Sequence, residues 1–251
     1  MSELTHGGRK PLLKALVGSH NYNLNVPESD KDYKIFVMPT FDDLYYKNEF
    51  TNNKVGETED YDVHDIRKLT HLFFKANVNF LEILYSIELE ILVDKTKPEY
   101  KYLKAIIDKR EAICKMNMKY LYEACVGMHL QRRKIFIKNN DAKQAMTSYR
   151  ILDFLTRYKN AIESNVDHPF EVAMRYSEEE REKLLNMRKG IYSKEQYLSI
   201  LDTKLKQVKE SCEEYYKSKE AKKDIKTFVD NQVKEMIKET LLNQFRKEII
   251  G

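Results

Sequence analysis

The chain has 251 residues, of which 42% are hydrophobic and 33% are charged. Its 44 basic and 40 acidic side chains leave a formal net charge of +4, which suits a nucleic-acid partner without arguing for one. No apolar run approaches the roughly 18 residues of a membrane span, and the polar stretch Met1–Arg9 has no signal-peptide pattern. Cys114, Cys125 and Cys212 lack zinc-site spacing, so we expect reduced thiols in a cytoplasmic protein with no membrane partner.

The first part of the chain mixes short apolar segments with polar turns. The predicted elements are a short helix over residues 9–17, a strand over residues 33–38, a helix or loop followed by a polar turn over residues 40–56, and a second strand over residues 57–64. Asp65 is placed to cap a helix that begins at Ile66 and buries Leu69, Leu72 and Phe73.

From about residue 100 onward the pattern is helical. Apolar residues recur at helical spacing in segments near residues 103–107, 120–128, 145–155, 198–208 and 225–245. Thr96-Lys97-Pro98 interrupts the pattern and marks the best domain boundary. We therefore predict an α+β protein, with a small mixed sheet and flanking helices in residues 1–98 and a mostly helical domain in residues 99–251.

One N-terminal segment has the residues of a catalytic site: Gly18-Ser19 is followed, after a short loop, by Asp30-Lys31-Asp32. Because successive strand residues point to opposite faces, Asp30 and Asp32 share a face and lie about 6.5 Å apart along the chain. Two such carboxylates suit Mg²⁺, which keeps few protein ligands and takes substrate phosphates as the others. Gly18 permits close backbone approach, and Ser19 adds a hydroxyl to N–H groups that can hold phosphate. The segment predicts a metal-dependent nucleotide site.

This segment resembles the catalytic signature of the DNA polymerase β-like nucleotidyltransferase superfamily. The closest resemblance is to its RNA repair pathway polymerase β family, also described as predicted nucleotidyltransferases. The matching residues are Gly18, Ser19, Tyr22, Ser29, Asp30, Asp32 and Pro39. Asn23 stands where the family has Gly, and Lys34 stands where Arg is common. The resemblance implies the nucleotidyltransferase fold, a small mixed sheet with flanking helices, for residues 1–98.

The likeness continues more loosely into the helical half and covers most of residues 10–210. Residues 75–84 resemble a family run in which Val78 replaces a Pro, and residues 141–150 resemble a helical segment in which Thr147 replaces a His. Residues 187–193 resemble an Arg-x-Gly turn before a helix. Because of Thr147, any role of that His in relatives is not carried over to this chain.

A third carboxylate is needed for two-metal transfer. In the resembling family it lies on the strand just before a helix that opens with a run like Ile66-Arg67-Lys68-Leu69. Asp60 and Asp62 both precede this run and share a strand face with His64. We predict Asp62, which is nearer the strand centre, and keep Asp60 as the alternative. Both are solvated positions if the acidic stretch is a loop.

The resemblance implies transfer of a nucleoside monophosphate from a nucleoside triphosphate to an acceptor hydroxyl, with release of pyrophosphate. Asp30, Asp32 and Asp62 would hold Mg²⁺ or Mn²⁺, and Gly18 and Ser19 would hold the β- and γ-phosphates. The other candidates for binding the nucleotide are His20, Lys68, Lys143 and Arg150. A structural hydrogen bond is the alternative for His20, and a surface position is the alternative for the three cations.

The sequence leaves the acceptor and two other function classes open. An RNA end is the acceptor that the family suggests, and a protein hydroxyl or a small molecule is the alternative. The basic cluster Gln131–Lys134 is either a contact for a nucleic-acid backbone or a solvated helix face. The other classes are a non-catalytic module that binds nucleotide or RNA, and a helical protein that recruits a partner. The oligomeric state stays open.

Overall fold

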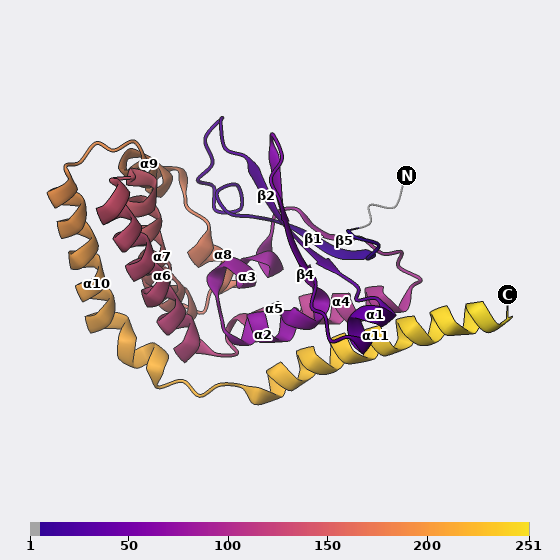
Figure 1. Cartoon of the computed structure of the whole chain (residues 1–251). Coiled ribbons are helices and arrows are strands. Elements are labelled where there is room, and N and C mark those ends of the chain that lie inside the picture. The colour runs from indigo at the N-terminus through magenta and orange to yellow at the C-terminus, as the bar shows by residue number, and fades with distance from the viewer. Residues whose placement is uncertain (1–5, 251) are drawn as a thin grey trace.

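The computed structural model describes the backbone of residues 6–250 and the side chains of residues 6–246. Within these residues a mixed five-stranded sheet has the order β3-β4-β2-β1-β5 (Figure 1). The strands are β1 (Pro11–Val17), β2 (Lys31–Val37), β3 (Thr51–Lys54), β4 (Glu59–Asp65) and β5 (Leu89–Ile91). β2 and β4 are parallel, and the other neighbouring pairs are antiparallel. The predicted α+β class with a mixed sheet is confirmed at this level.

β1 overturns the helix predicted over residues 9–17. Leu12, Leu13, Ala15 and Leu16 are all buried, because β1 lies between β2 and β5 and is covered on both faces. A strand buried on both faces shows no alternation of apolar and polar residues. Its pattern therefore does not separate it from a buried helix.

β2 and β4 confirm the two predicted strands and set the register of the acidic residues. Asp32 lies opposite Asp60, and Lys34 lies opposite Asp62. Because side chains alternate across a sheet, this register puts all four side chains on one face. β3 forms where a polar turn is predicted, because pairing with β4 stabilises a segment whose residues are all exposed.

Short helices connect the strands on the C-terminal side of β2 and β4. They are α1 (Phe41–Tyr45), the 3-10 helix η1 (Ile66–Lys68), α2 (Leu69–Phe74), α3 (Val78–Leu81) and the 3-10 helix η2 (Glu82–Tyr85). Asp65 caps η1 as predicted, since its Oδ1 accepts a hydrogen bond from the Arg67 N–H at 2.9 Å. Leu69 and Phe73 are buried and Leu72 is partly buried against the same core, which confirms the predicted apolar face.

The rest of the described chain is helical, as predicted. Its helices are α4 (Pro98–Asp108), α5 (Arg110–Cys114), α6 (Met118–Asn139), α7 (Ala142–Glu163), α8 (Pro169–Met174), α9 (Glu178–Arg188), α10 (Lys194–Lys217) and α11 (Lys223–Ile250). α6, α7 and α10 pack side by side as a bundle, with α9 against α7 (Figure 1). α11 leaves the bundle and runs back along α4 and α2. These two helices and the five-stranded sheet form the part that we call the sheet half.

A continuous hydrophobic core joins the two halves of the molecule. It includes Leu12 of β1, Phe73 of α2, Leu155 of α7, Leu201 of α10 and Met236 of α11. The boundary predicted between residues 98 and 99 falls in the first turn of α4, and its role as a division between folding units stays a prediction. None of the helices in residues 6–250 combines the length and apolar character that crossing a membrane requires.

Candidate active site

A cleft of about 630 Å³ lies between one end of the sheet and helices α6, α7 and α9. Its lining comes from the turn after β1, from the starts of β2 and β4, and from the helices facing them. The predicted site residues that it gathers are Gly18, Ser19, Asp30, Asp32, Asp62, Lys143 and Arg150. Asp60, the alternative third acid, lines it as well. Segments far apart in the sequence therefore meet here.

Two predicted nucleotide-binding residues do not line the cleft. The Lys68 ammonium donates a hydrogen bond to the Thr51 hydroxyl instead. Because Lys68 follows β4 while Asp60 lies near the start of that strand, the length of the strand separates the two residues. His20 Nε2 lies 3.0 Å from the carbonyl oxygen of Ser29. That contact is the structural role given as the alternative for His20, and it ties the turn after β1 to the segment before β2.

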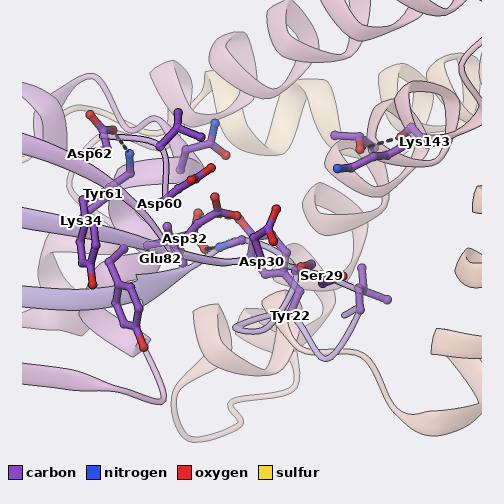
Figure 2. A pocket seen from close by; sticks show the side chains of 18 of the residues that line it. Tyr22, Ser29, Asp30, Asp32, Lys34, Asp60, Tyr61, Asp62, Glu82 and Lys143 are labelled. Carbon is purple, nitrogen blue, oxygen red and sulfur yellow. Dashed lines mark hydrogen bonds and ion pairs between the residues drawn. The ribbon is translucent and has the colours of Figure 1, made fainter. Parts of the chain in front are cut away.

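Asp30, Asp32 and Asp60 are gathered at the centre of the cleft (Figure 2). Asp30 and Asp32 are exposed to it, and Asp60 is half-buried. Partial desolvation and the nearby carboxylates of Asp60 and Asp30 raise the pKa of Asp32, while Lys143 and Lys34 oppose that shift. Clustered carboxylates that repel one another in this way are stabilised by a bound cation.

Asp62 lies to one side of this group, where it contacts Lys34 (Figure 2). Its Oδ2 is 2.5 Å from Lys34 Nζ. The same oxygen is 2.9 Å from His64 Nε2. Burial opposes the charge of Asp62, but His64 and Lys34 hold its pKa at about 2. Asp62 is thus already neutralised by the protein, whereas Asp60 accepts only the Gly56 N–H, at 3.2 Å, among the described residues.

The turn after β1 needs the glycine that the motif provides. Gly18 has φ of +75°, and a Cβ there would lie 2.9 Å from Asp32 Oδ2. Asn23, where the resembling family has Gly, has φ of 61°, a left-handed conformation that Asn tolerates better than most residues.

In comparisons with known proteins, no protein-family model and no curated protein matches the chain. The resemblance therefore rests on the residues themselves and stays a prediction.

The side chain of Glu82 holds the turn after β1 in place through two hydrogen bonds. Its Oε2 accepts the Gly18 N–H at 3.0 Å, and its Oε1 accepts the Tyr22 hydroxyl at 2.7 Å. Burial raises the pKa of Glu82, against the effect of these two donors. The guanidinium of Arg150 lies 4.0 Å from the Tyr22 ring centroid, so α7 of the helical bundle supports the same turn. Because Gly18 N–H is already bonded, Ser19 is the residue of the pair that is available to a phosphate.

The wall opposite the carboxylates is basic. Lys143 and Arg150 of α7 line it, together with Arg132 of α6 and Arg188 of α9 (Figure 2 shows Lys143 across from the acids). Arg188 was not among the predicted site residues. It belongs to the 187–193 stretch that resembles the family, but the sequence does not show that α9 packs beside α7 and brings it to the cleft.

The donor set of the cleft fits a divalent cation that also binds substrate. Among residues 6–246, no three His, Cys, Asp or Glu side chains converge tightly enough to hold a metal ion by themselves. Asp30, Asp32 and Asp60 offer only oxygen atoms, which are the ligands that Mg²⁺ and Mn²⁺ prefer. Mg²⁺ sites commonly take remaining ligands from water and substrate phosphates. The residues therefore fit a metal that arrives with a nucleotide.

Proposed function

We propose that the protein transfers a nucleoside monophosphate from a nucleoside triphosphate to an acceptor hydroxyl, with release of pyrophosphate. The observation that supports this most is the position of Asp32 and Asp60. They lie opposite each other on adjacent parallel strands, beside the Gly18-Ser19 turn and across from a basic wall. This arrangement supports the proposal, because the reaction needs carboxylates to hold the metal ions and cations near the phosphates.

Each group of residues has one role in this proposal. Asp30, Asp32 and Asp60 would hold Mg²⁺ or Mn²⁺, which when bound supplies positive charge at the reacting phosphate and activates the attacking hydroxyl. Ser19 binds the phosphate tail, and Lys143 with Arg188 neutralises its charge. Glu82 and Arg150 keep the turn in position. The geometry favours Asp60 over Asp62 as the third carboxylate, because Asp62 is engaged by Lys34 and His64.

The test is transfer of label from each α-³²P nucleoside triphosphate, with Mg²⁺ or Mn²⁺, to an RNA pool or a cell extract. We expect labelled product from the wild-type protein. Asp32→Asn should lower the rate at least about 100-fold, since it removes roughly 3 kcal/mol of transition-state stabilisation. Its thermal stability should be unchanged or higher, because the substitution relieves repulsion between carboxylates.

Asp230→Asn is the matched control, because Asp230 is exposed on α11 and does not line the cleft. It should retain the wild-type rate. Nucleotide binding without transfer in the wild-type protein would contradict the proposal and support a non-catalytic module. Neither binding nor transfer would leave the helical interaction protein as the better hypothesis.

A further inference from the structure

A group of basic residues covers the end of the helical bundle nearest the cleft. Four helix ends meet there, namely the C-terminal ends of α6 and α9 and the N-terminal ends of α7 and α10 (Figure 1). We call this surface the basic end. Its cationic residues are Arg132, Arg133, Lys134, Lys138, Lys143, Arg188, Lys189 and Lys194.

Contacts between helices hold these four helix ends together. Arg132 Nη1 of α6 donates to Gln144 Oε1 of α7 at 3.0 Å. Lys194 Nζ at the start of α10 donates to the Ile137 carbonyl of α6 at 2.8 Å. Gly190, just after α9, lies so close to Ala142 of α7 that an added Cβ would be 3.6 Å from the Ala142 Cβ. The four helix ends are therefore neighbours in space as well as similar in charge.

The basic end is poorly neutralised. Arg133 pairs with Asp202 of α10 at 3.0 Å, but within residues 6–246 no other residue of the group forms an ion pair. Lys134, Lys138 and Lys189 are exposed. On α9, Glu178, Glu179 and Glu182 line a hollow together with Lys189, and Glu178 also contacts Asn23 in the turn after β1. Two further carboxylates lie at these helix ends, where Asp141 caps α7 and Glu195 accepts the Ser193 hydroxyl. The eight cations of the basic end still outnumber the acidic residues near them.

The basic end is continuous with the cleft. Arg132, Lys143 and Arg188 belong to both, since they line the cleft wall that faces the carboxylates. At about 630 Å³ the cleft has the size of a small-molecule site, so it admits the end of a strand and not the side of a duplex. Repeated cations that lead into such a site match the repeated phosphates of a nucleic-acid backbone.

We propose that the basic end binds the backbone of a single-stranded nucleic acid and directs its terminal hydroxyl into the cleft. The acceptor role rests on the proposed transferase function, whereas the binding does not. A protein acceptor is disfavoured, because a folded protein surface carries both signs of charge and would gain little from so many unpaired cations. The inference assigns the acceptor to nucleic acid.

The test measures the affinity of a fluorescein-labelled 20-nucleotide oligouridylate by fluorescence anisotropy, in EDTA and without nucleotide, over a range of salt concentrations. The triple variant Lys134→Gln, Lys138→Gln, Lys189→Gln changes residues that lie outside the cleft. We expect at least about tenfold weaker binding at 0.1 M salt. The slope of log affinity against log salt should fall by about 2, because each lost phosphate contact contributes about 0.7.

The matched control removes three charges just beyond the opposite end of α10, where the chain enters α11, as Lys219→Gln, Lys222→Gln, Lys223→Gln. It should bind within about twofold of wild type. Equal losses in the two variants, or no salt-dependent binding by wild type, would overturn the proposal. Equal affinity for a polyglutamate peptide would overturn it in favour of an acidic protein partner. Because EDTA prevents transfer, these outcomes do not depend on whether the enzyme is active.

Discussion

Asp60 and Asp62 are two residues apart on one strand and face the same side of the sheet, yet their surroundings differ. Asp62 contacts the buried Lys34 and His64, and these contacts hold its pKa at about 2. Asp60 lies opposite Asp32 and contributes to the raised pKa of that group. The charge of Asp62 is thus stabilised by neighbouring side chains of the protein. The charge of Asp60 lies beside another carboxylate, where a bound cation would stabilise it.

The two substitutions Asp60→Asn and Asp62→Asn should therefore have opposite effects. Asp60→Asn should lower transfer at least about 100-fold with little change in the free energy of unfolding. Asp62→Asn should lower the free energy of unfolding by about 1–2 kcal/mol, a figure reduced for partial exposure of the pair, because it leaves Lys34 without its anionic partner. Transfer by Asp62→Asn should fall less than about tenfold.

Initial rates of label transfer and urea denaturation measure these two effects. Lys34→Met together with Asp62→Asn serves as the control, because removing both charges leaves neither one unpaired. The reverse pattern, with transfer lost in Asp62→Asn and retained in Asp60→Asn, would show that Asp62 is the third carboxylate, as the sequence predicts.

Only those features of the candidate site that depend on the pattern of residues along a single segment could be predicted from the sequence. Alternation along a strand places Asp30 and Asp32 on one face, and Asp60 and Asp62 on one face. Which pair comes together depends on the register of β4 against β2, and no residue of either strand encodes that locally. Lys68 illustrates the same limit, since its position after β4 takes it away from the cleft that the rest of the motif forms.

At the scale of elements, the sequence pattern predicts a helix or strand correctly where that segment's own residues determine its structure. It fails where pairing or packing with a neighbouring segment determines it. The capped helix after β4 and the long helices α6, α7 and α10 follow their sequence patterns. β1 does not, because burial on both faces removes the alternation that marks a strand. β3 is a polar, exposed segment, and only its pairing with β4 makes it a strand.

The turn between β1 and β2 depends on Gly18 for two separable reasons. Its φ of +75° is unfavourable for other residues, and a Cβ would lie 2.9 Å from Asp32 Oδ2. We expect Gly18→Ala to cost about 1–2 kcal/mol of stability and to lower transfer at least about tenfold, because it displaces the Asp32 carboxylate. Urea denaturation and initial rates measure the two effects.

Gly8→Ala separates backbone strain from displacement of Asp32. Gly8 has φ of +77°, but a Cβ there meets nothing within 4 Å among the described residues. It should carry a similar backbone cost and retain the wild-type transfer rate. Equal activity of the two variants would mean that the contact between residue 18 and Asp32 does not matter for transfer.

At the scale of the whole molecule, the cleft depends on how the two halves are held together. Arg150 of α7 supports the turn after β1 through Tyr22, and Arg188 of α9 lines the wall opposite the carboxylates. α11 then leaves the bundle and packs on α4 and α2 of the sheet half. A cleft built in this way has its carboxylates on one half and most of its cations on the other, so it forms only when both halves are folded and packed against each other.

Met236→Ala in α11 tests whether the halves unfold as one unit. Met236 is fully buried in the continuous core, and truncating it should lower the free energy of unfolding by about 2–4 kcal/mol. Because the core spans both halves, urea denaturation followed by circular dichroism should keep a single transition that shifts as a whole. Leu242→Ala is the control on the same helix, since Leu242 is 46% exposed and should change stability by less than about 0.5 kcal/mol. Two separate transitions would instead mean that the sheet half and the bundle fold independently, and that the cleft forms by docking of two stable parts.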